Sequence, residues 1–189
     1  MAKIFRRYKS TIYGNYRKAY LIDGAVTGAA MGLVLTVRDY LAESPMGQPE
    51  NFVTEVVMAV GIFWFAYRYR KHLPEQKVTL KELMLLGLGI GVVGSVVYGL
   101  WTWLRCGVLD SSMVEFYNCQ RISVMEPADS SAQAKAAVEM VRGYTAGDWA
   151  FIGAFRSAVM SIIMAFLAAL IFKTEQSPVV ERESKKGKK

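Results

Sequence analysis

The sequence predicts an all-α integral membrane bundle of four transmembrane helices, with an extracytoplasmic segment containing a short helix between the third and fourth. Three observations lead to this fold class. Hydrophobic residues make up 53% of the 189 residues, and the mean hydropathy of +0.22 is high for a soluble domain. Apolar residues gather in four runs, at about 20–37, 52–69, 83–104 and 149–172, and a helix of about 20 residues crosses a bilayer. Basic residues gather between these runs.

Residues 1–19 form a basic leader on the cytoplasmic side. The first 18 residues contain six basic side chains and no acidic one. Two structures fit this pattern: a short amphipathic helix on the membrane surface, or a solvated, partly frayed leader. A signal peptide does not fit, because the following apolar stretch is too long and contains Asp23.

The first span, 20–37, places Gly24, Gly28 and Gly32 four residues apart, which lets another helix backbone approach closely. Asp23 lies near its inner end, where it either anchors the helix at the interface or forms a proton or ion site. Residues 38–51 follow as a turn-rich polar loop.

The second span, 52–69, ends in an aromatic cluster typical of a membrane interface and has no ridge of small residues. Glu55 lies about one turn inside its start. The basic loop that follows contains the one histidine of the chain, His72, without ligand partners at metal-binding spacing. We therefore expect His72 on the surface, and neither a metal site nor a cofactor.

The third and fourth spans carry the longest ridges of small residues. In 83–104 the ridge consists of Gly87, Gly91, Ser95 and Gly99, and in 149–172 of Gly153, Ser157, Ser161, Ala165 and Ala169. Helices in lipid associate through close backbone contact, so the first, third and fourth spans should form the tight core, with the second more peripheral. Homodimerisation is the other use of such ridges. The glycines of the third span resemble a nucleotide loop, but no strand precedes them.

The segment 105–148 is the one substantial region between spans outside the membrane. Asp129 or Ser130 can cap a helix that ends at Gly143. This helix either rests on the bundle or forms a cap that binds a ligand or partner. Cys106 and Cys119, the two cysteines of the chain, both fall here, and an oxidising compartment predicts a disulfide between them. Alternatively, Cys106 is a small buried apolar residue.

The distribution of charge predicts the topology. The leader contains six Lys or Arg, the stretch 68–81 five, and residues 173–189, a basic disordered tail, another six. The stretch 38–51 contains one and 105–148 four. Positive residues favour the cytoplasmic side, so both termini should be cytoplasmic. The basic residues lie between apolar runs without interleaved aromatics, which argues against nucleic-acid binding.

Glu55 and Arg156 enter the membrane from the same side at comparable depth, which predicts an intramembrane ion pair between the second and fourth spans. Two alternatives stay open. Arg156 snorkels to the interface, or both charges line a transport pathway.

No catalytic motif accompanies these features: the sequence contains no paired-carboxylate pattern, Ser-His or Cys-His arrangement, or phosphate loop. We therefore expect a non-enzymatic inner-membrane protein, an accessory or scaffold subunit for a membrane partner. The alternative is a small homo-oligomeric transporter or channel with Glu55 and Arg156 in its pathway. The expected surroundings are the lipid bilayer and either a membrane-protein partner or further copies of the chain.

Four stretches resemble an uncharacterised family of bacterial four-helix inner-membrane proteins, domain of unknown function 4199. They are the glycine-rich first span, the loop Y-R-Y-R-K-H-L-P-E-Q-K-V-T-L-K-E leading into G-L-G-I-G-V-V-G, the polar segment 105–148, and the closing I-G-A-F-R-S-A-V-M-S-I-I-M-A-F-L-A-A-L-I-F-K. The resemblance covers most of residues 19–173. It implies an inner-membrane location and lends neither an activity nor functional residues.

Overall fold

The structure, a computed structural model, describes residues 16–41, 52–72, 78–125 and 132–173. Its four long helices are α2 (Tyr16–Leu41), α3 (Phe52–His72), α4 (Leu80–Leu104) and α7 (Ala146–Phe172). Each is long and apolar enough to cross a membrane. The predicted all-α class with four candidate membrane spans is therefore confirmed, while most of the basic leader and tail lies outside the described residues.

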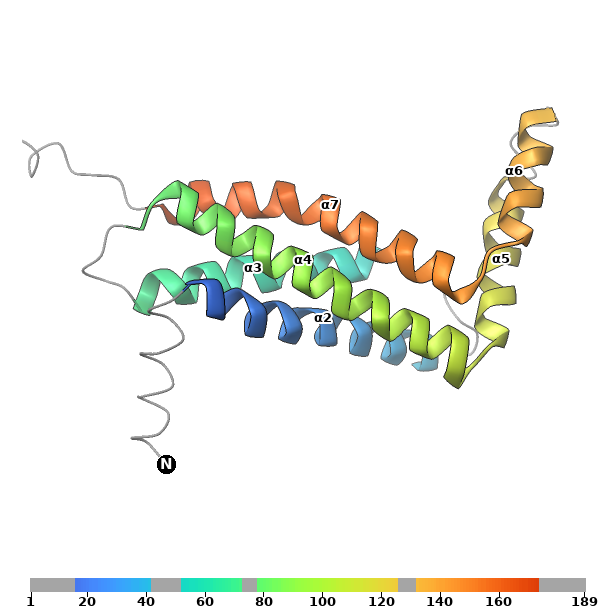
Figure 1. The fold of residues 1–189 in the computed structure, drawn as a ribbon, viewed down its shortest axis with the longest axis horizontal. Helices are drawn as coiled ribbons and strands as arrows, with labels where there is room; N and C mark the ends of the chain where they lie inside the picture. The colour runs from blue at the N-terminus through green and yellow to red at the C-terminus, as the bar shows by residue number, and fades with distance from the viewer. Residues whose placement is uncertain (1–15, 42–51, 73–77, 126–131, 174–189) are drawn as a thin grey trace, which may run out of the picture.

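The four long helices run side by side (Figure 1). α4 packs along both α2 and α7, and α3 contacts the same two helices on the other side of the bundle. α4 is thus the central helix of the closely packed part. α3 makes fewer contacts with the other long helices than α4 makes with α2 and α7, in agreement with the prediction that the second span is more peripheral.

Local capping sets where two of these helices begin. Thr79 accepts a hydrogen bond from the backbone N–H of Glu82, and the Glu82 carboxylate accepts one from the N–H of Thr79, which forms a capping box. Thr145 and Asp148 form the same reciprocal pair at the start of α7. Both helices consequently begin a turn before the predicted spans at 83 and 149.

α2 is also longer than predicted, because it continues to Leu41. Arg38 and Asp39, assigned from the sequence to the loop 38–51, therefore belong to the last turns of the helix. The last apolar residue before them was a poor marker of the helix end, because a buried salt bridge supports this turn.

The glycines of α2 face α4. A Cβ at Gly24 would lie 2.7 Å from the Cβ of Val93, and one at Gly32 would lie 2.7 Å from the Trp101 ring. A Cβ at Gly28 would collide with the backbone of Gly94. The two backbones approach this closely because the glycines carry no side chain.

The ridge of α4 faces α7 in the same way. A Cβ at Gly87 would lie 2.7 Å from that of Ala165, one at Gly99 would lie 2.9 Å from that of Ala154, and one at Gly91 would overlap with Ser161. The rest of the predicted ridge, Ser95, Gly153, Ser157 and Ala169, is also buried. Ridge residues of α2, α4 and α7 are thus packed within one chain rather than left open for a second copy.

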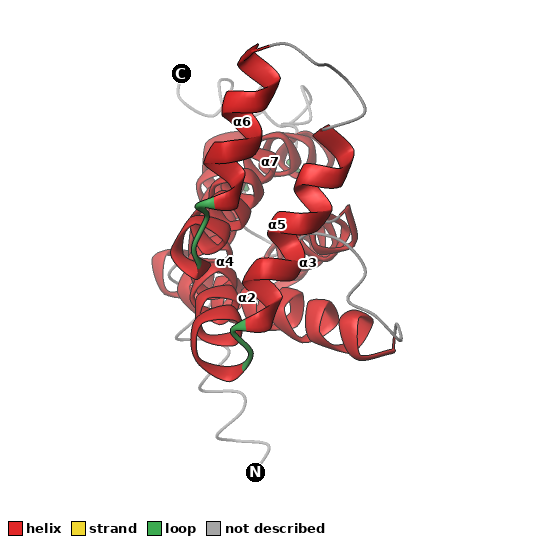
Figure 2. Cartoon of the chain, turned by 90° about the vertical axis from the view of Figure 1, so that its right-hand side faces the viewer, coloured by secondary structure: helices red, strands yellow, loops and turns green. Residues whose placement is uncertain are grey.

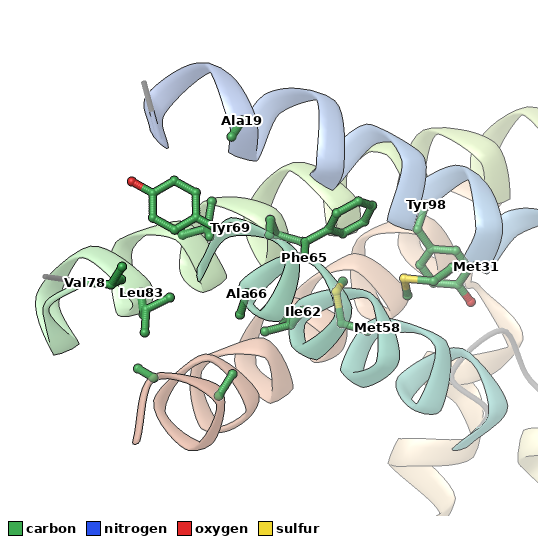
Figure 3. Close-up of a cluster of buried hydrophobic side chains, with 14 of the residues drawn as sticks. Ala19, Met31, Met58, Ile62, Phe65, Ala66, Tyr69, Val78, Leu83 and Tyr98 are labelled. Carbon is green, nitrogen blue, oxygen red and sulfur yellow. The ribbon is translucent and has the colours of Figure 1, made fainter. Parts of the chain in front are cut away.

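α3 contributes mainly larger side chains, together with one close contact at Gly61, where an added Cβ would lie 2.6 Å from Thr27 of α2. Met58, Ile62, Phe65, Ala66 and Tyr69 are buried in a cluster that fills the space between the helices (Figure 3). Met31, Leu83 and Tyr98 of the neighbouring helices join this cluster. The side chains of α3 therefore complete the core between the helices.

One end of the bundle carries an additional helical segment. α4 continues into a π-helical turn, η1 (Arg105–Leu109), and is followed by α5 (Ser112–Met125) and α6 (Ala132–Arg142). α5 and α6 contact each other and lie across the end of the four long helices (Figure 2). A single short helix was predicted here, so α5 was missed; the capping residues Asp129 and Ser130 lie outside the described residues.

Candidate functional site

The two charges predicted to pair within the membrane lie together in the structure. Arg156 Nε lies 2.5 Å from Glu55 Oε1, which connects α7 to the first turn of α3. The Glu55 side chain is 10% exposed and the Arg156 side chain 45% exposed. The pair therefore lies at the surface of the bundle, where it ties the less closely packed α3 to α7.

A second charged cluster joins the end of α2 to η1, the turn that continues α4, and the sequence did not predict it. The carboxylate of Asp39 is 1% exposed and accepts hydrogen bonds at both oxygens. Arg38 donates from Nε to Oδ1 at 2.8 Å, and Arg105 donates to Oδ2 at 2.6 Å. Charge-assisted bonds of this kind are stronger than neutral ones, which compensates for the burial of the carboxylate.

Tyr117 extends this cluster to α5, because its hydroxyl donates to Asp39 Oδ2 at 3.3 Å. Burial, and then the negative charge of Asp39, raises the pKa of Tyr117 above its usual value. The phenol therefore stays protonated and remains a donor throughout the physiological pH range. α2, η1 and α5 thus meet at one buried carboxylate.

An aromatic layer beside this cluster holds α5 against α7. The indole N–H of Trp149 donates to the side-chain oxygen of Asn118 at 2.8 Å, and the amide of Asn118 donates to the carbonyl of Tyr144 at 3.1 Å. The Trp149 ring also contacts Tyr117 and Tyr144, with centroids 5.7 and 5.6 Å away. The oxygen and the nitrogen of the Asn118 side-chain amide are both hydrogen-bonded, so the middle of α5 is held in a defined position.

A groove of about 680 Å³ opens between α5 and the end of α6. We call it the α5–α6 groove; its lining consists of Ser111, Val114, Glu115, Asn118, Cys119, Ile122, Ser123, Arg142 and Tyr144. This volume falls within the range of small-ligand sites. The lining combines apolar side chains with one acidic and one basic residue, which suits an amphipathic partner better than a purely apolar one.

The two cysteines are free thiols, so the predicted disulfide is wrong. Cys106 is buried in the π-helical turn against Met113, Tyr117 and Trp149, in agreement with the alternative of a buried apolar residue. Cys119 is exposed in the α5–α6 groove. The helical conformation of α5, which the sequence did not reveal, directs the two side chains to different environments.

The described charged side chains include several ion pairs between helices, such as those of Asp39 and Glu55. Within the described ranges, no three His, Cys, Asp or Glu side chains lie close enough to hold a metal ion. The side chain of His72 lies outside the described part. Asp23 is buried on α2, and its Oδ2 has no hydrogen-bond partner among the described residues. The arrangement therefore provides charged contacts between helices and one groove outside the spans.

The sequence could have indicated the Asp39 cluster only through charge placement. Asp39 is an acidic residue directly beyond an apolar run, and Arg105 holds the equivalent place after the third span. Opposite charges at the same end of two packed helices are candidates for pairing. Tyr117 carried no such signal, because its partner depends on the path of α5.

Comparison with known proteins gives one match. No curated protein and no solved structure matches the chain. A family model described as protein of unknown function (DUF4199) matches residues 23–174, which include most of α2, the other three candidate membrane spans and the α5–α6 end. The resemblance drawn from the sequence motifs is thereby confirmed: the chain belongs to the DUF4199 family of proteins of unknown function.

Proposed function

We propose that the protein is a non-enzymatic subunit of a bacterial inner membrane that scaffolds or assists a membrane partner through the α5–α6 groove. The observation behind this proposal is the attachment of α5. Asp39 bonds to Arg105 and Tyr117, and Asn118 bonds to Trp149, so one wall of the groove is fixed to the membrane bundle. A recess held rigidly at the end of a bundle can position a partner relative to the bilayer.

The packing of the four long helices supports the same proposal. The small residues of α2, α4 and α7 are used in contacts within the chain, and large side chains fill the space beside α3. The groove therefore offers a surface for recognition outside the spans, whereas the small-residue ridges are already occupied.

The proposed orientation places both termini in the cytoplasm and the α5–α6 groove outside it. It rests on the Lys and Arg counts: six in the first 18 residues, five in 68–81 and six in 173–189, against one in 38–51 and four in 105–148. A partner would consequently be a membrane protein with an exposed segment on the outer face of that membrane.

Transport by a homo-oligomer is the second candidate, and one observation favours it. The side chain of Arg156 is 45% exposed beside Glu55, so this pair would lie at an interface if copies of the chain associated through α3 and α7. Charges at membrane depth are frequently part of ion pathways.

Photocrosslinking in native membranes tests the scaffold proposal. A photoreactive residue at Ser123 lies in the groove, whereas one at its neighbour Val124, which is 68% exposed, lies outside the groove lining. We expect one discrete adduct from position 123 and none from position 124. Asn118→Ala removes the hydrogen bond to Trp149 that holds α5 in place. We expect this variant to give less of the adduct and to leave the captured partner protein less stable in the membrane.

Equal adducts at both positions, or none, would contradict a partner in the groove. Flux measurements on the purified protein in vesicles separate the second candidate. If the protein carries a solute or ion across the vesicle membrane, and a folded Glu55→Gln variant does not, transport is the function and the scaffold proposal is wrong.

A further inference from the structure

The buried contacts that fix α5 to the bundle come from the first half of this helix. The cluster around Trp149 includes Met113 and Tyr117 of α5, and Asn118 accepts the hydrogen bond from the Trp149 indole. No described residue of α5 beyond Asn118 joins this cluster. The second half of α5 continues past the first turn of α7 (Figure 1). This half therefore needs a different support.

The end of the bundle where α5 is attached has the features of a membrane interface. Leu109 of η1 closes the third candidate span, and Phe151 lies in the second turn of α7; both are exposed apolar side chains. Exposed apolar residues on a membrane span contact lipid, and tryptophan and tyrosine are enriched at the level of the headgroups. Tyr117 bonds to Asp39 in the last turn of α2 and contacts the Trp149 ring. α5 therefore lies at the level of the interface rather than above it.

The helical repeat continues the bundle-facing side of α5 to Val124. Val124 lies seven residues beyond Tyr117, which is close to two full turns, so both side chains lie on one face. Tyr117 is buried against the bundle, whereas Val124 is 68% exposed. By the same repeat, Cys119 and Ser123 of the α5–α6 groove lie on the opposite side of the helix. The face of Val124 is thus directed toward the bilayer beside the bundle.

The neighbours of Val124 on this face suit the headgroup layer. Gln120 and Arg121 flank the line from Tyr117 to Val124. An arginine can lay its apolar stem along the surface of the hydrocarbon while its guanidinium stays among polar groups. One apolar side chain between two polar ones therefore fits the boundary between headgroups and acyl chains, and not the hydrocarbon core.

We propose that the second half of α5 lies in the headgroup layer of the adjacent leaflet, with Val124 inserted at the acyl boundary. Lipid thus supports the second half of the helix as the bundle supports the first. The contact uses the side of α5 away from the α5–α6 groove, so it is independent of whether that groove holds a partner. A photoreactive residue at position 124 would react with lipid and add no captured protein.

Collision rates of nitroxide labels in phosphatidylcholine vesicles test the proposal. The full chain carries Cys119→Ser, while Cys106 is buried and stays unlabelled. Single labels are placed at Val124→Cys and, as the water reference in the groove, at Ser123→Cys. The lipid reference is Val108→Cys, at an exposed residue inside a candidate span.

Oxygen concentrates in lipid and a nickel chelate in water, so the ratio of their collision rates with the label reports its depth. We expect the ratio at position 124 to be several-fold above that at position 123 and to approach that at position 108. A ratio equal to that at position 123 would place Val124 in water. Low collision rates with both reagents would place it under protein. Either result would overturn the proposal.

Val124→Asp tests the same contact without a label. Val124 is exposed, so the new charge leaves the core intact, but a charge at the acyl boundary opposes insertion. Hydrogen exchange in the second half of α5, measured in vesicles, should rise several-fold in this variant. Ser123→Asp places the same residue in the groove and should leave the exchange as in the parent. Equal exchange in the two variants would show that lipid does not hold this half of α5.

Discussion

Replacing Gly91 with alanine tests whether small side chains set the distance between α4 and α7. A Cβ at this position would overlap with the side chain of Ser161, which is fully buried. Alanine stabilises a helix interior by about 1 kcal/mol over glycine, whereas overpacking a close contact costs about 1–3 kcal/mol. We therefore expect Gly91→Ala to lower the free energy of unfolding by about 1 kcal/mol.

Ser161→Gly removes the atoms that the new methyl group would meet. The double variant should recover most of the lost stability, so that a double-mutant cycle gives a coupling of about 1 kcal/mol. Gly147→Ala is the matched control on the first turn of α7, because the nearest atom to its added Cβ lies 3.6 Å away. This control should keep or raise the stability.

Reversible unfolding in mixed micelles, followed by circular dichroism, measures the parent, the two single variants, the double variant and the control under one condition. A Gly91→Ala protein as stable as the parent would refute the close contact between α4 and α7. Additive effects of the two substitutions would refute the assignment of Ser161 as the residue that limits the space.

Three further predictions concern the thiols and the charged pairs. An impermeant maleimide added outside intact cells should label the exposed Cys119 but not the buried Cys106; labelling of Cys119 only after the membrane is opened would reverse the proposed orientation. Glu55→Gln and Arg156→Gln should each lower stability with a coupling of about 1 kcal/mol in a bilayer, and strict additivity would show that the contact contributes nothing. Asp39→Asn should destabilise the protein by about 3 kcal/mol, because two mostly buried guanidinium groups lose the negative charge of Asp39; hydrogen exchange in α5 should rise, and unchanged exchange would contradict the role of Asp39.

The long helices were predictable because membrane insertion imposes a strong requirement on sequence. A span needs about 20 apolar residues, and four such runs stand out between polar stretches. Gly24 and Gly91 were also recognisable as packing positions, since four-residue spacing places small residues on one helix face. Their specific partners, Val93 and Ser161, depend on the rotation of each helix and were not contained in the spacing.

The end of the bundle was less predictable, for a physical reason. α5 has no clear separation of apolar and polar faces, because its two sides contact Trp149 and the α5–α6 groove respectively. The assumption of a loop between Cys106 and Cys119 led to the predicted disulfide. Asp39 was missed because the apolar pattern ends before the helix does.

The place of α4 between α2 and α7 has a consequence for biogenesis. Translation delivers α2 to the membrane two spans before the helix that covers its glycines, and α7 enters last. Until α4 is inserted, Gly28 and its neighbours face lipid, and α2 and α3 rely on their smaller mutual contact. Insertion of α4 therefore supplies the contact that covers the glycines of α2, and insertion of α7 completes the bundle. A delay at that step prolongs the exposure of the unfinished bundle to membrane quality-control proteases.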